Sequence, residues 1–322
     1  MLRLMASSSR KTLPNKEAGD RMSIFPTKIL LATDGSKDAE LAAKAAVDLS
    51  TRTGAQLHVV HAWRPLPHYA YPTLTPEEYH PPFEEGARKL LDEQLEHIDE
   101  AGGVVAGSHL VAGRPADAIL DLAEKVEVDL IVVGSRGLGP LRRLVVGSVS
   151  GEIVHHADLP VLVVRGGEGA WPLKRVVVGD DGSEPAKRAG ELAVGIAEAF
   201  GAEAALVRAY QSSPEPIGGW TAEDRRELDQ TLSRERQALD ERGKELGMIA
   251  GSPPAVKLID TEPTLAMLLV AEEGEEEKTL IAVGSRGVGV AKRAMLGSVS
   301  SKILRVAVGP VLVCPRGRPT EV

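Results

Sequence analysis

Residues 134–150 read GSRGLGPLRRLVVGSVS, and residues 284–300 read GSRGVGVAKRAMLGSVS. Ten of these 17 positions are identical at an offset of 150 residues. A similar match lies near the start of each half, where ILLATDGS at 29–36 pairs with VVVGDDGS at 176–183. This repeat is far longer than a solenoid unit, so the chain is predicted to be a tandem duplication of one domain.

Around these stretches, each half alternates short apolar runs with segments of helical apolar spacing. In the first half, strands are predicted at 28–33, 56–63, 104–111, 129–133 and 160–164, and helices at 36–50, 84–101, 115–126 and 148–156. In the second half, strands are predicted near 175–178, 204–210, 256–259, 280–283 and 311–314. This alternation is typical of right-handed βαβ units, so we predict an α/β fold whose parallel sheets are covered on both faces.

Composition agrees with this fold and excludes several functions. Of the 322 residues, 43% are apolar and only 3% aromatic, so the core is expected to be aliphatic. A formal charge of -8 gives no general attraction to nucleic acid, which we do not expect as a ligand. The single cysteine, Cys314, excludes an intrachain disulfide, and the histidine spacing shows no metal motif. No run of 18 apolar residues occurs, so we expect a cytoplasmic protein without a membrane span.

Domain boundaries follow from composition. We expect residues 1–24 to form a disordered tail, without the apolar segment of a secretory signal. Residues 25–165 form the first predicted domain, and the Gly-rich residues 166–173 form the linker. The second predicted domain spans 174–316, and a short tail follows at 317–322.

Two surface segments lead to separate expectations. The Pro-rich stretch 64–83 concentrates aromatic residues, and we expect a loop there that acts as a lid or partner surface unless it packs on its own domain. The helix near 222–246 mixes acidic and basic residues, so we expect a solvated face that carries no site.

The residues after the fourth strand can hold phosphate. In an open parallel sheet, ligands bind beyond the carboxyl ends of the strands. Gly134 and Gly137 follow a buried strand, and Gly147, Ser148 and Ser150 begin a helix. Glycines allow several N–H groups to approach one anion, and the helix N-terminus and serine hydroxyls add donors. The alternative is that these glycines only form turns and Ser148 is only an N-cap.

Better-known phosphate motifs are absent from the sequence. No GxxxxGK[ST] and no GxGxxG follows a strand, which disfavours a P-loop NTPase and a classical dinucleotide dehydrogenase. Asp34 and Asp181 end the first strand of each half, where a carboxylate can accept hydrogen bonds from a sugar or base. The alternative for both is an Asx-turn before Gly35 and Gly182.

The pairing of DGS with G-x2-G-x9-G-S resembles the universal stress protein family, in particular its nucleotide-binding members with tandem domains. The resemblance covers residues 25–165 and 174–316. It implies two Rossmann-like domains, each with a five-stranded sheet of order 3-2-1-4-5 and ATP bound across the first and fourth strands. It also implies antiparallel pairing of the two last strands, PVLVVR and PVLVCPR, and it leaves homodimerisation open.

The resemblance also implies the site residues, position by position. It places Asp34 and Ala62 beside the adenosine and the glycine loop around the phosphates, with Mg²⁺ held through the phosphates themselves. The set implied for the first domain is Thr33, Asp34, Ala62, Gly113, Gly134, Arg136, Gly137, Gly147, Ser148, Val149 and Ser150. The set for the second domain is Asp180, Asp181, Ala209, Gly284, Arg286, Gly287, Gly297, Ser298, Val299 and Ser300.

The second site departs from the pattern more than the first. Thr261-Glu262-Pro263 replaces the Gly113-Arg114-Pro115 turn, and Asp180 stands where the first half has Thr33. Because both changes add a carboxylate, we predict weaker nucleotide binding in the second half.

The hypothesis is a protein that binds ATP, or senses ADP or AMP, and couples occupancy to a stress response through protein partners not identified by the sequence. Arg136 and Arg286 lie in the glycine loops, but no base or dedicated metal ligand is recognisable, which favours binding over efficient hydrolysis. One alternative is a slow ATPase or other adenine-nucleotide hydrolase, although the loops TDGSKD and DDGSEP lack the second glycine of the SGGxDS loop of ATP pyrophosphatases. The other is a structural pseudo-dimer that binds only protein partners.

Overall fold

A computed structural model of the chain describes residues 25–65, 76–136, 146–212, 220–285 and 296–316. Its first half contains β1 (Lys28–Ala32), α1 (Lys37–Thr53), β2 (Gln56–Trp63), α2 (Pro76–Glu100), β3 (Val105–Ala112), α3 (Pro115–Val126), β4 (Leu130–Gly134), α4 (Ser148–His156) and β5 (Val161–Val164). Its second half contains β6 (Arg175–Gly179), α5 (Glu184–Phe200), β7 (Glu203–Tyr210), α6 (Ala222–Ala250), β8 (Ala255–Asp260), α7 (Pro263–Glu272), β9 (Thr279–Gly284), α8 (Ser298–Val306) and β10 (Val311–Cys314).

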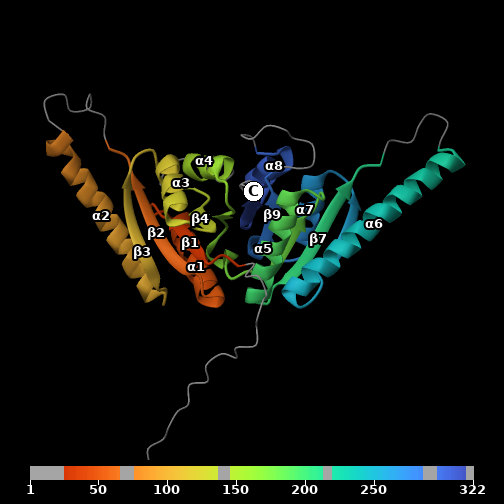
Figure 1. Cartoon of the computed structure of the whole chain (residues 1–322), viewed down its shortest axis with the longest axis horizontal. Helices are drawn as coiled ribbons and strands as arrows, with labels where there is room; N and C mark the ends of the chain where they lie inside the picture. The colour runs from red at the N-terminus through yellow and green to blue at the C-terminus, as the bar shows by residue number, and fades with distance from the viewer. Residues whose placement is uncertain (1–24, 66–75, 137–145, 213–219, 286–295, 317–322) are drawn as a thin grey trace, which may run out of the picture.

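The ten strands form one continuous sheet (Figure 1). Its order is β3-β2-β1-β4-β5-β10-β9-β6-β7-β8, which contains the order 3-2-1-4-5 once in each half. Neighbouring strands within each half are parallel. The predicted α/β fold and strand order are confirmed.

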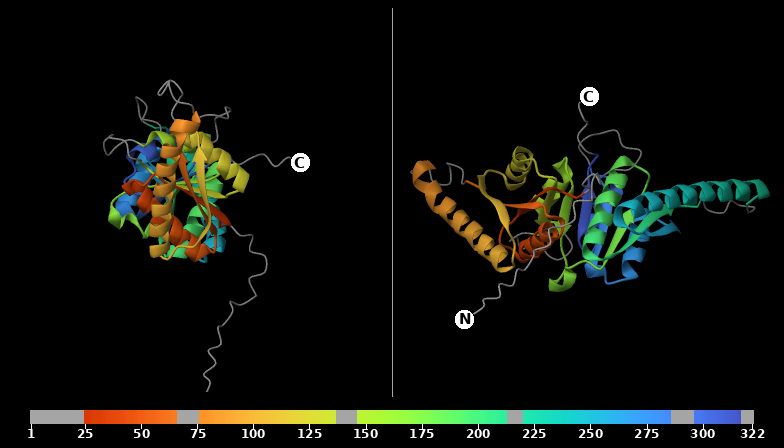
Figure 2. Two further views of the ribbon diagram at one scale, coloured as in Figure 1. Left: turned by 90° about the vertical axis from the view of Figure 1, so that its left-hand side faces the viewer. Right: turned by 60° about the horizontal axis from the view of Figure 1, so that its bottom comes forward.

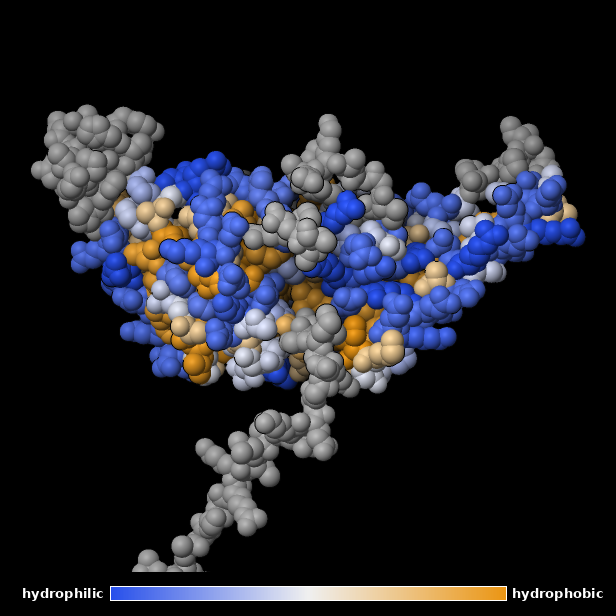
Figure 3. Space-filling model, in the orientation of Figure 1, coloured by the Kyte–Doolittle hydropathy of each residue, from blue (hydrophilic) through white to orange (hydrophobic). Residues whose placement is uncertain are grey.

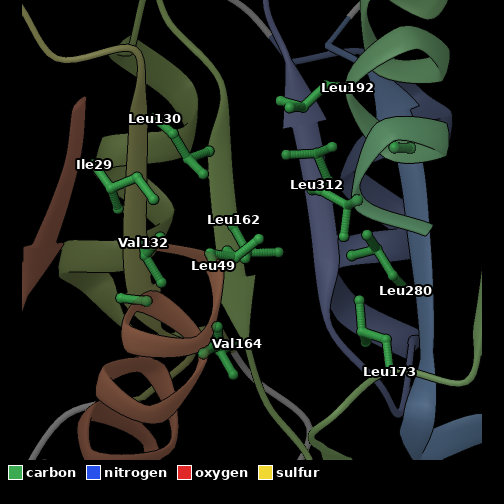
Figure 4. Packing of buried hydrophobic residues seen from close by; sticks show 14 of the residues in the cluster. Ile29, Leu49, Leu130, Val132, Leu162, Val164, Leu173, Leu192, Leu280 and Leu312 are labelled. Atoms are coloured by element: carbon green, nitrogen blue, oxygen red, sulfur yellow. The ribbon is translucent and has the colours of Figure 1, made fainter. Parts of the chain in front are cut away.

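The two halves join through β5 and β10. These strands are antiparallel, and Leu162 pairs with Leu312 at the centre of the contact. Both leucine side chains enter the same apolar cluster, which continues from one half into the other (Figure 4). Because every residue of both strands is buried, the seam between the halves is part of the protein core.

Alternation along the strands creates a core on each face of the sheet. Ile29 and Leu31 join the apolar cluster that includes residues of α1, α2, α5 and α6. Leu30 and Ala32 join the cluster on the other face, which includes residues of α3, α4, α7 and α8. The long helices α2 and α6 lie at the two outer ends of the molecule (Figures 1 and 2).

Local sequence signals set both ends of α1 and α5, the first helix of each half. Ser36 caps α1 by accepting a hydrogen bond from the Ala39 N–H, and Ser183 caps α5 in the same way at Ala186. Gly54 and Gly201 end these helices in the left-handed conformation, which glycine adopts without strain. The two DGS motifs are therefore strand-to-helix turns.

The prediction for the stretch before α2 needs correction. The stretch 64–83 was expected to be a loop, but α2 begins at Pro76, eight residues before the predicted helix start at Glu84. Proline is tolerated in the first turn of a helix, because the N–H that it lacks has no intrahelical partner there. Residues 66–75 lie outside the described part of the chain.

The segment between the halves is ordered and packed. Residues 168–170 form a short 3-10 helix, and Trp171 and Leu173 are buried in the core. The Trp171 indole Nε1–H donates to Asp48 of α1 at 2.7 Å, and its ring packs edge-on against Phe200 of α5. The connection thus contacts helices from both halves. Among the described residues, no helix combines the length and apolar character needed to cross a membrane.

Candidate functional site

The carboxyl ends of β1 and β6 carry the two predicted aspartates. Asp34 Oδ1 accepts a hydrogen bond from the Ser36 N–H, and Asp181 Oδ1 accepts one from the Ser183 N–H, each at 3.0 Å. Both are therefore Asx-turns, the alternative that the sequence left open, and both place a carboxylate at the strand end. An Asx-turn uses one carboxylate oxygen, so it is compatible with ligand contact by the same side chain.

Gly134 and Gly284, which end β4 and β9, lie against the first turns of α1 and α5. A Cβ atom at Gly134 would lie 2.6 Å from the carbonyl carbon of Asp38. A Cβ atom at Gly284 would lie 2.7 Å from the backbone nitrogen of Ala186. Close packing between strand and helix therefore requires both glycines, whether or not a ligand is present.

Asp38 orders the beginning of the first glycine loop. Its Oδ2 accepts hydrogen bonds from Ser135 Oγ at 2.6 Å and from Arg136 Nε at 3.0 Å, and its Oδ1 accepts one from an Arg136 terminal nitrogen at 3.2 Å. This bidentate pair directs the Arg136 side chain toward α1. Pro185 occupies the equivalent position in the second half, so the arrangement occurs once.

The beginnings of α4 and α8 present backbone donors. Ser150 Oγ donates to the Ser135 carbonyl at 2.9 Å, and Ser300 Oγ donates to the Ser285 carbonyl at 3.1 Å. These buried hydroxyls hold each loop on its helix. Among the described residues, no side chain caps α4 or α8, in contrast to α1, α5, α6 and α7. The N–H groups of residues 148–150 and 298–300 therefore lack a side-chain acceptor and suit an anion.

In the second half, these elements enclose a pocket of about 580 Å³. This volume is within the usual range for a small-molecule site. Its apolar surface comes from Met267, Val207 and Leu258. Tyr210, the last residue of β7, also lines the pocket. The predicted site residues that line the pocket are Asp180, Asp181, Ala209, Gly284, Gly297, Ser298, Val299 and Ser300.

A charged network that sequence analysis missed forms part of this pocket. Arg208, on β7, makes an ion pair with Asp180, whose side chain is 2% exposed. Its other terminal nitrogen contacts Glu235 of α6 at 2.8 Å. The helix near 222–246, which was expected to carry no site, contributes Thr231 and Glu235 to the wall of this pocket. A comparison of the two repeats could have found Arg208, because His61 stands at the equivalent position.

Glu262, which we expected only to repel phosphate, also has a structural role. It caps α7 by accepting from the Leu265 N–H at 3.1 Å, and it forms an ion pair with Lys302 of α8 at 3.0 Å. Partial burial opposes ionisation, but the hydrogen bonds from Lys302 and Thr264 dominate and lower the pKa of Glu262. The first half reverses the charges, because Arg114 faces Glu152 at 3.4 Å.

The remaining predicted residues fall into two groups. In the first half, Thr33, Asp34, Ala62, Gly113, Gly134, Arg136 and Gly147–Ser150 lie on the strand ends, turns and helix start expected for them. Gly113 has a φ of 149°, a value that Thr261 in the second half cannot easily reach. Gly137, Arg286 and Gly287 lie outside the described residues.

Metal and redox chemistry find little support in the described part of the chain. No group of three or more His, Cys, Asp or Glu residues there is placed to hold a metal ion. Burial raises the pKa of the Cys314 thiol to about 12, so this side chain stays protonated at neutral pH. Binding through backbone N–H groups and hydroxyls is the chemistry that this arrangement supports.

Comparison with known proteins gives a consistent result. The model of the universal stress protein family matches residues 26–165 and 172–315. A universal stress protein of Thermus aquaticus is 41% identical over 140 residues, which is 42% of this chain and 96% of that protein.

One solved structure has the same tandem fold over most of the chain. A universal stress protein from Archaeoglobus fulgidus aligns over 90% of this chain and 99% of its own, with a TM-score of 0.64 and 24% identity. Another universal stress protein, solved in complex with cAMP, is 27% identical and covers 44% of this chain and 98% of its own, with a TM-score of 0.33.

Proposed function

We propose that this chain, which belongs to the universal stress protein family, binds an adenine nucleotide, ATP foremost, in each half and regulates partner proteins according to its occupancy. The observation that carries the proposal is the pocket of the second half. There, the end of β6, the end of β9 and the uncapped start of α8 meet around a volume that fits a nucleotide.

Each part of the pocket suits one part of a nucleotide. The apolar side chains of Met267 and Leu258 suit a purine ring, and the Asp181 carboxylate suits ribose hydroxyls. The N–H groups at the start of α8 suit the phosphates, as do those at the start of α4 in the first half. Mg²⁺, when bound, would neutralise phosphate charge, and we propose that the phosphates rather than a carboxylate cluster hold it.

Binding without efficient turnover is the activity that the site supports best. Arg136, the cation at the beginning of the first glycine loop that the structure describes, is held by Asp38. A hydrolase needs charge stabilisation at the γ-phosphate and an oriented water molecule. Asp34 and Asp181 each use one carboxylate oxygen in an Asx-turn, and we assign the other to the ribose, so neither is proposed as the base for that water. We therefore propose a nucleotide-dependent regulator.

The test is calorimetric titration of nucleotide-stripped protein with ATP and Mg²⁺, using charge changes at the two helix starts. Ser148→Asp and Ser298→Asp each add a carboxylate at an exposed first helical position, where a negative charge favours the helix and disfavours bound phosphate. We expect two sites, the tighter one lost in Ser148→Asp and the weaker one lost in Ser298→Asp.

Ser148→Ala and Ser298→Ala are the matched controls. They remove the same hydroxyl without adding charge, so they are expected to retain binding within about threefold if backbone N–H groups are the main donors. If folded wild-type protein takes up no ATP, or if both aspartate variants bind it as wild type does, the proposal fails. A scaffold that binds only protein partners would then be the better description.

A further inference from the structure

A second pocket lies at the seam between the halves and shares Ser135 and Arg136 with the first glycine loop. Its volume is about 920 Å³, and we call it the seam pocket. The first half of the chain contributes the start of α1, the end of β4 and the segment after β5 to its wall. The end of α8 and the following turn contribute the other half, so the pocket exists only because β5 and β10 join the halves.

Cations dominate the wall of the seam pocket. Only three carboxylates line it, Asp38, Glu40 and Glu277, and Asp38 is already paired with Arg136. The five cations that line it are Lys37, Lys44, Arg136, Arg165 and Arg305. The wall therefore carries a formal charge of +2, in a chain whose total is -8.

Arg165 is the unusual member of this group. It is only 8% exposed, and a terminal nitrogen of its guanidinium donates a hydrogen bond to the Ala307 carbonyl at 3.0 Å. Its Nε is buried without a hydrogen-bond partner, and no described carboxylate lies within 4.0 Å of its guanidinium nitrogens. Burial lowers the pKa of Arg165 to about 10, so it is still charged at neutral pH. The nearby charge of Asp38 opposes this lowering and that of Arg136 adds to it. Because Asp38 is already paired with Arg136, it compensates the buried charge of Arg165 only in part, and a bound anion would complete the compensation.

The opposite mouth of the seam shows that the fold itself does not require these cations. In the duplication, Lys37 corresponds to Glu184 and Lys44 corresponds to Glu191. Arg165 corresponds to Pro315, and Arg305 corresponds to His155. None of these four equivalents is a lysine or an arginine. The equivalents of Glu40, Leu41 and Arg136 are Lys187, Arg188 and Arg286, so the positions of the cations, rather than their presence, are specific to this mouth.

We propose that the seam pocket binds a small phosphorylated metabolite. Its phosphate groups lie against Arg165, Lys44 and Arg305, whose guanidinium and ammonium donors match multivalent oxyanions. The apolar part of the ligand lies on Val306 and Val308, which are 48% and 46% exposed at the rim. The ligand contacts both halves, so its binding strengthens their association.

The test uses inorganic pyrophosphate as the probe of the anionic part. Calorimetric titration is carried out on the Ser148→Asp/Ser298→Asp protein, which keeps the probe away from both proposed nucleotide sites. We expect one pyrophosphate per chain. Adding Lys44→Glu and Arg305→Glu, two changes of exposed residues, should weaken binding at least tenfold, because each removes a charge-assisted contact.

Lys89→Glu with Arg226→Glu is the matched control, since these exposed residues of α2 and α6 give the same change in total charge. It should leave pyrophosphate affinity within about twofold of the parent. The proposal is overturned if the parent protein binds no pyrophosphate, or if the seam and control variants bind it equally. Its outcome is independent of ATP binding, which is titrated separately on Lys44→Glu/Arg305→Glu in the wild-type background and is expected to be unchanged.

Discussion

The two halves share one backbone plan but place different side chains beneath their sites. In the first half, Thr33 Oγ1 donates to Gln94 Oε1 at 2.9 Å, and His61 Nδ1 donates to the Thr33 carbonyl at 2.8 Å. In the second half, the equivalents of Thr33 and His61 are Asp180 and Arg208, which form a buried ion pair.

This difference separates what the fold requires from what each site adds. Both arrangements give a partner to the polar side chain at the end of the first strand of their half, although Arg208 Nε is buried without one, so either is compatible with the sheet. The pocket of the second half, however, is lined by the carboxylates of Asp180, Asp181 and Glu235. Among its described lining residues, Arg208 is the only cation. We therefore expect the second half to bind polyphosphate more weakly, as the sequence predicted.

The largest expected effect comes from breaking the buried ion pair. Arg208→Met leaves the Asp180 carboxylate buried without its partner and should lower the free energy of unfolding by about 3–5 kcal/mol. The double change Asp180→Thr/Arg208→His copies the first half and should cost less than about 1.5 kcal/mol. Urea unfolding at pH 7 measures both. If the double variant is as unstable as the single one, the two networks are not interchangeable.

A smaller effect tests what the halves have in common. Gly134→Ala and Gly284→Ala each introduce a methyl group less than 3 Å from the backbone of the packed helix, and each should cost about 1–3 kcal/mol. Gly86→Ala is the control, because it lies in α2 with no atom within 4 Å of its added Cβ and should stabilise by about 0.5–1 kcal/mol. Wild-type stability of either site variant in urea would contradict the close packing.

The reversed ion pairs at α3 and α7 should give a still smaller and unequal effect. Glu262→Ala removes a helix cap and should cost about 1 kcal/mol. Arg114→Ala, at the equivalent position, removes an exposed ion pair and no cap, so it should cost less than about 0.5 kcal/mol. Thermal unfolding distinguishes the two, and equal losses would show that Glu262 acts only through its charge.

Sequence patterns were sufficient for the duplication and, through the resemblance, for the strand order. They did not identify the polar partners, because these meet only after folding. Thr33, His61 and Gln94 are up to 61 residues apart, and Asp38 is 98 residues from Arg136. The motif glycines illustrate the same limit, since Gly134 and Gly284 fit a phosphate loop in sequence but are explained in structure by contact with a helix.

The smallest expected difference between the halves is a response to pH. His58 and His109 stack in the first half, with 3.2 Å between Nδ1 of one and Nε2 of the other. Ala205 and Lys257 are their equivalents in the second half. Burial lowers the pKa of both histidines, and Lys28 lowers that of His58 further. The charges of His58 and Lys125 lower the pKa of His109 further.

A histidine whose pKa is lowered by folding binds protons more weakly in the folded chain than in the unfolded chain. Its contribution is therefore intact above the ordinary value of 6.5 and is lost as the pH falls through the folded-state pKa. We expect His58→Gln/His109→Gln to flatten the decline in unfolding free energy between pH 7.5 and pH 5. The exposed pair in His155→Gln/His156→Gln should leave that decline unchanged. Urea titrations across this pH range would contradict the assignment if both variants followed the wild-type slope, because the histidine stack would then be neutral toward folding.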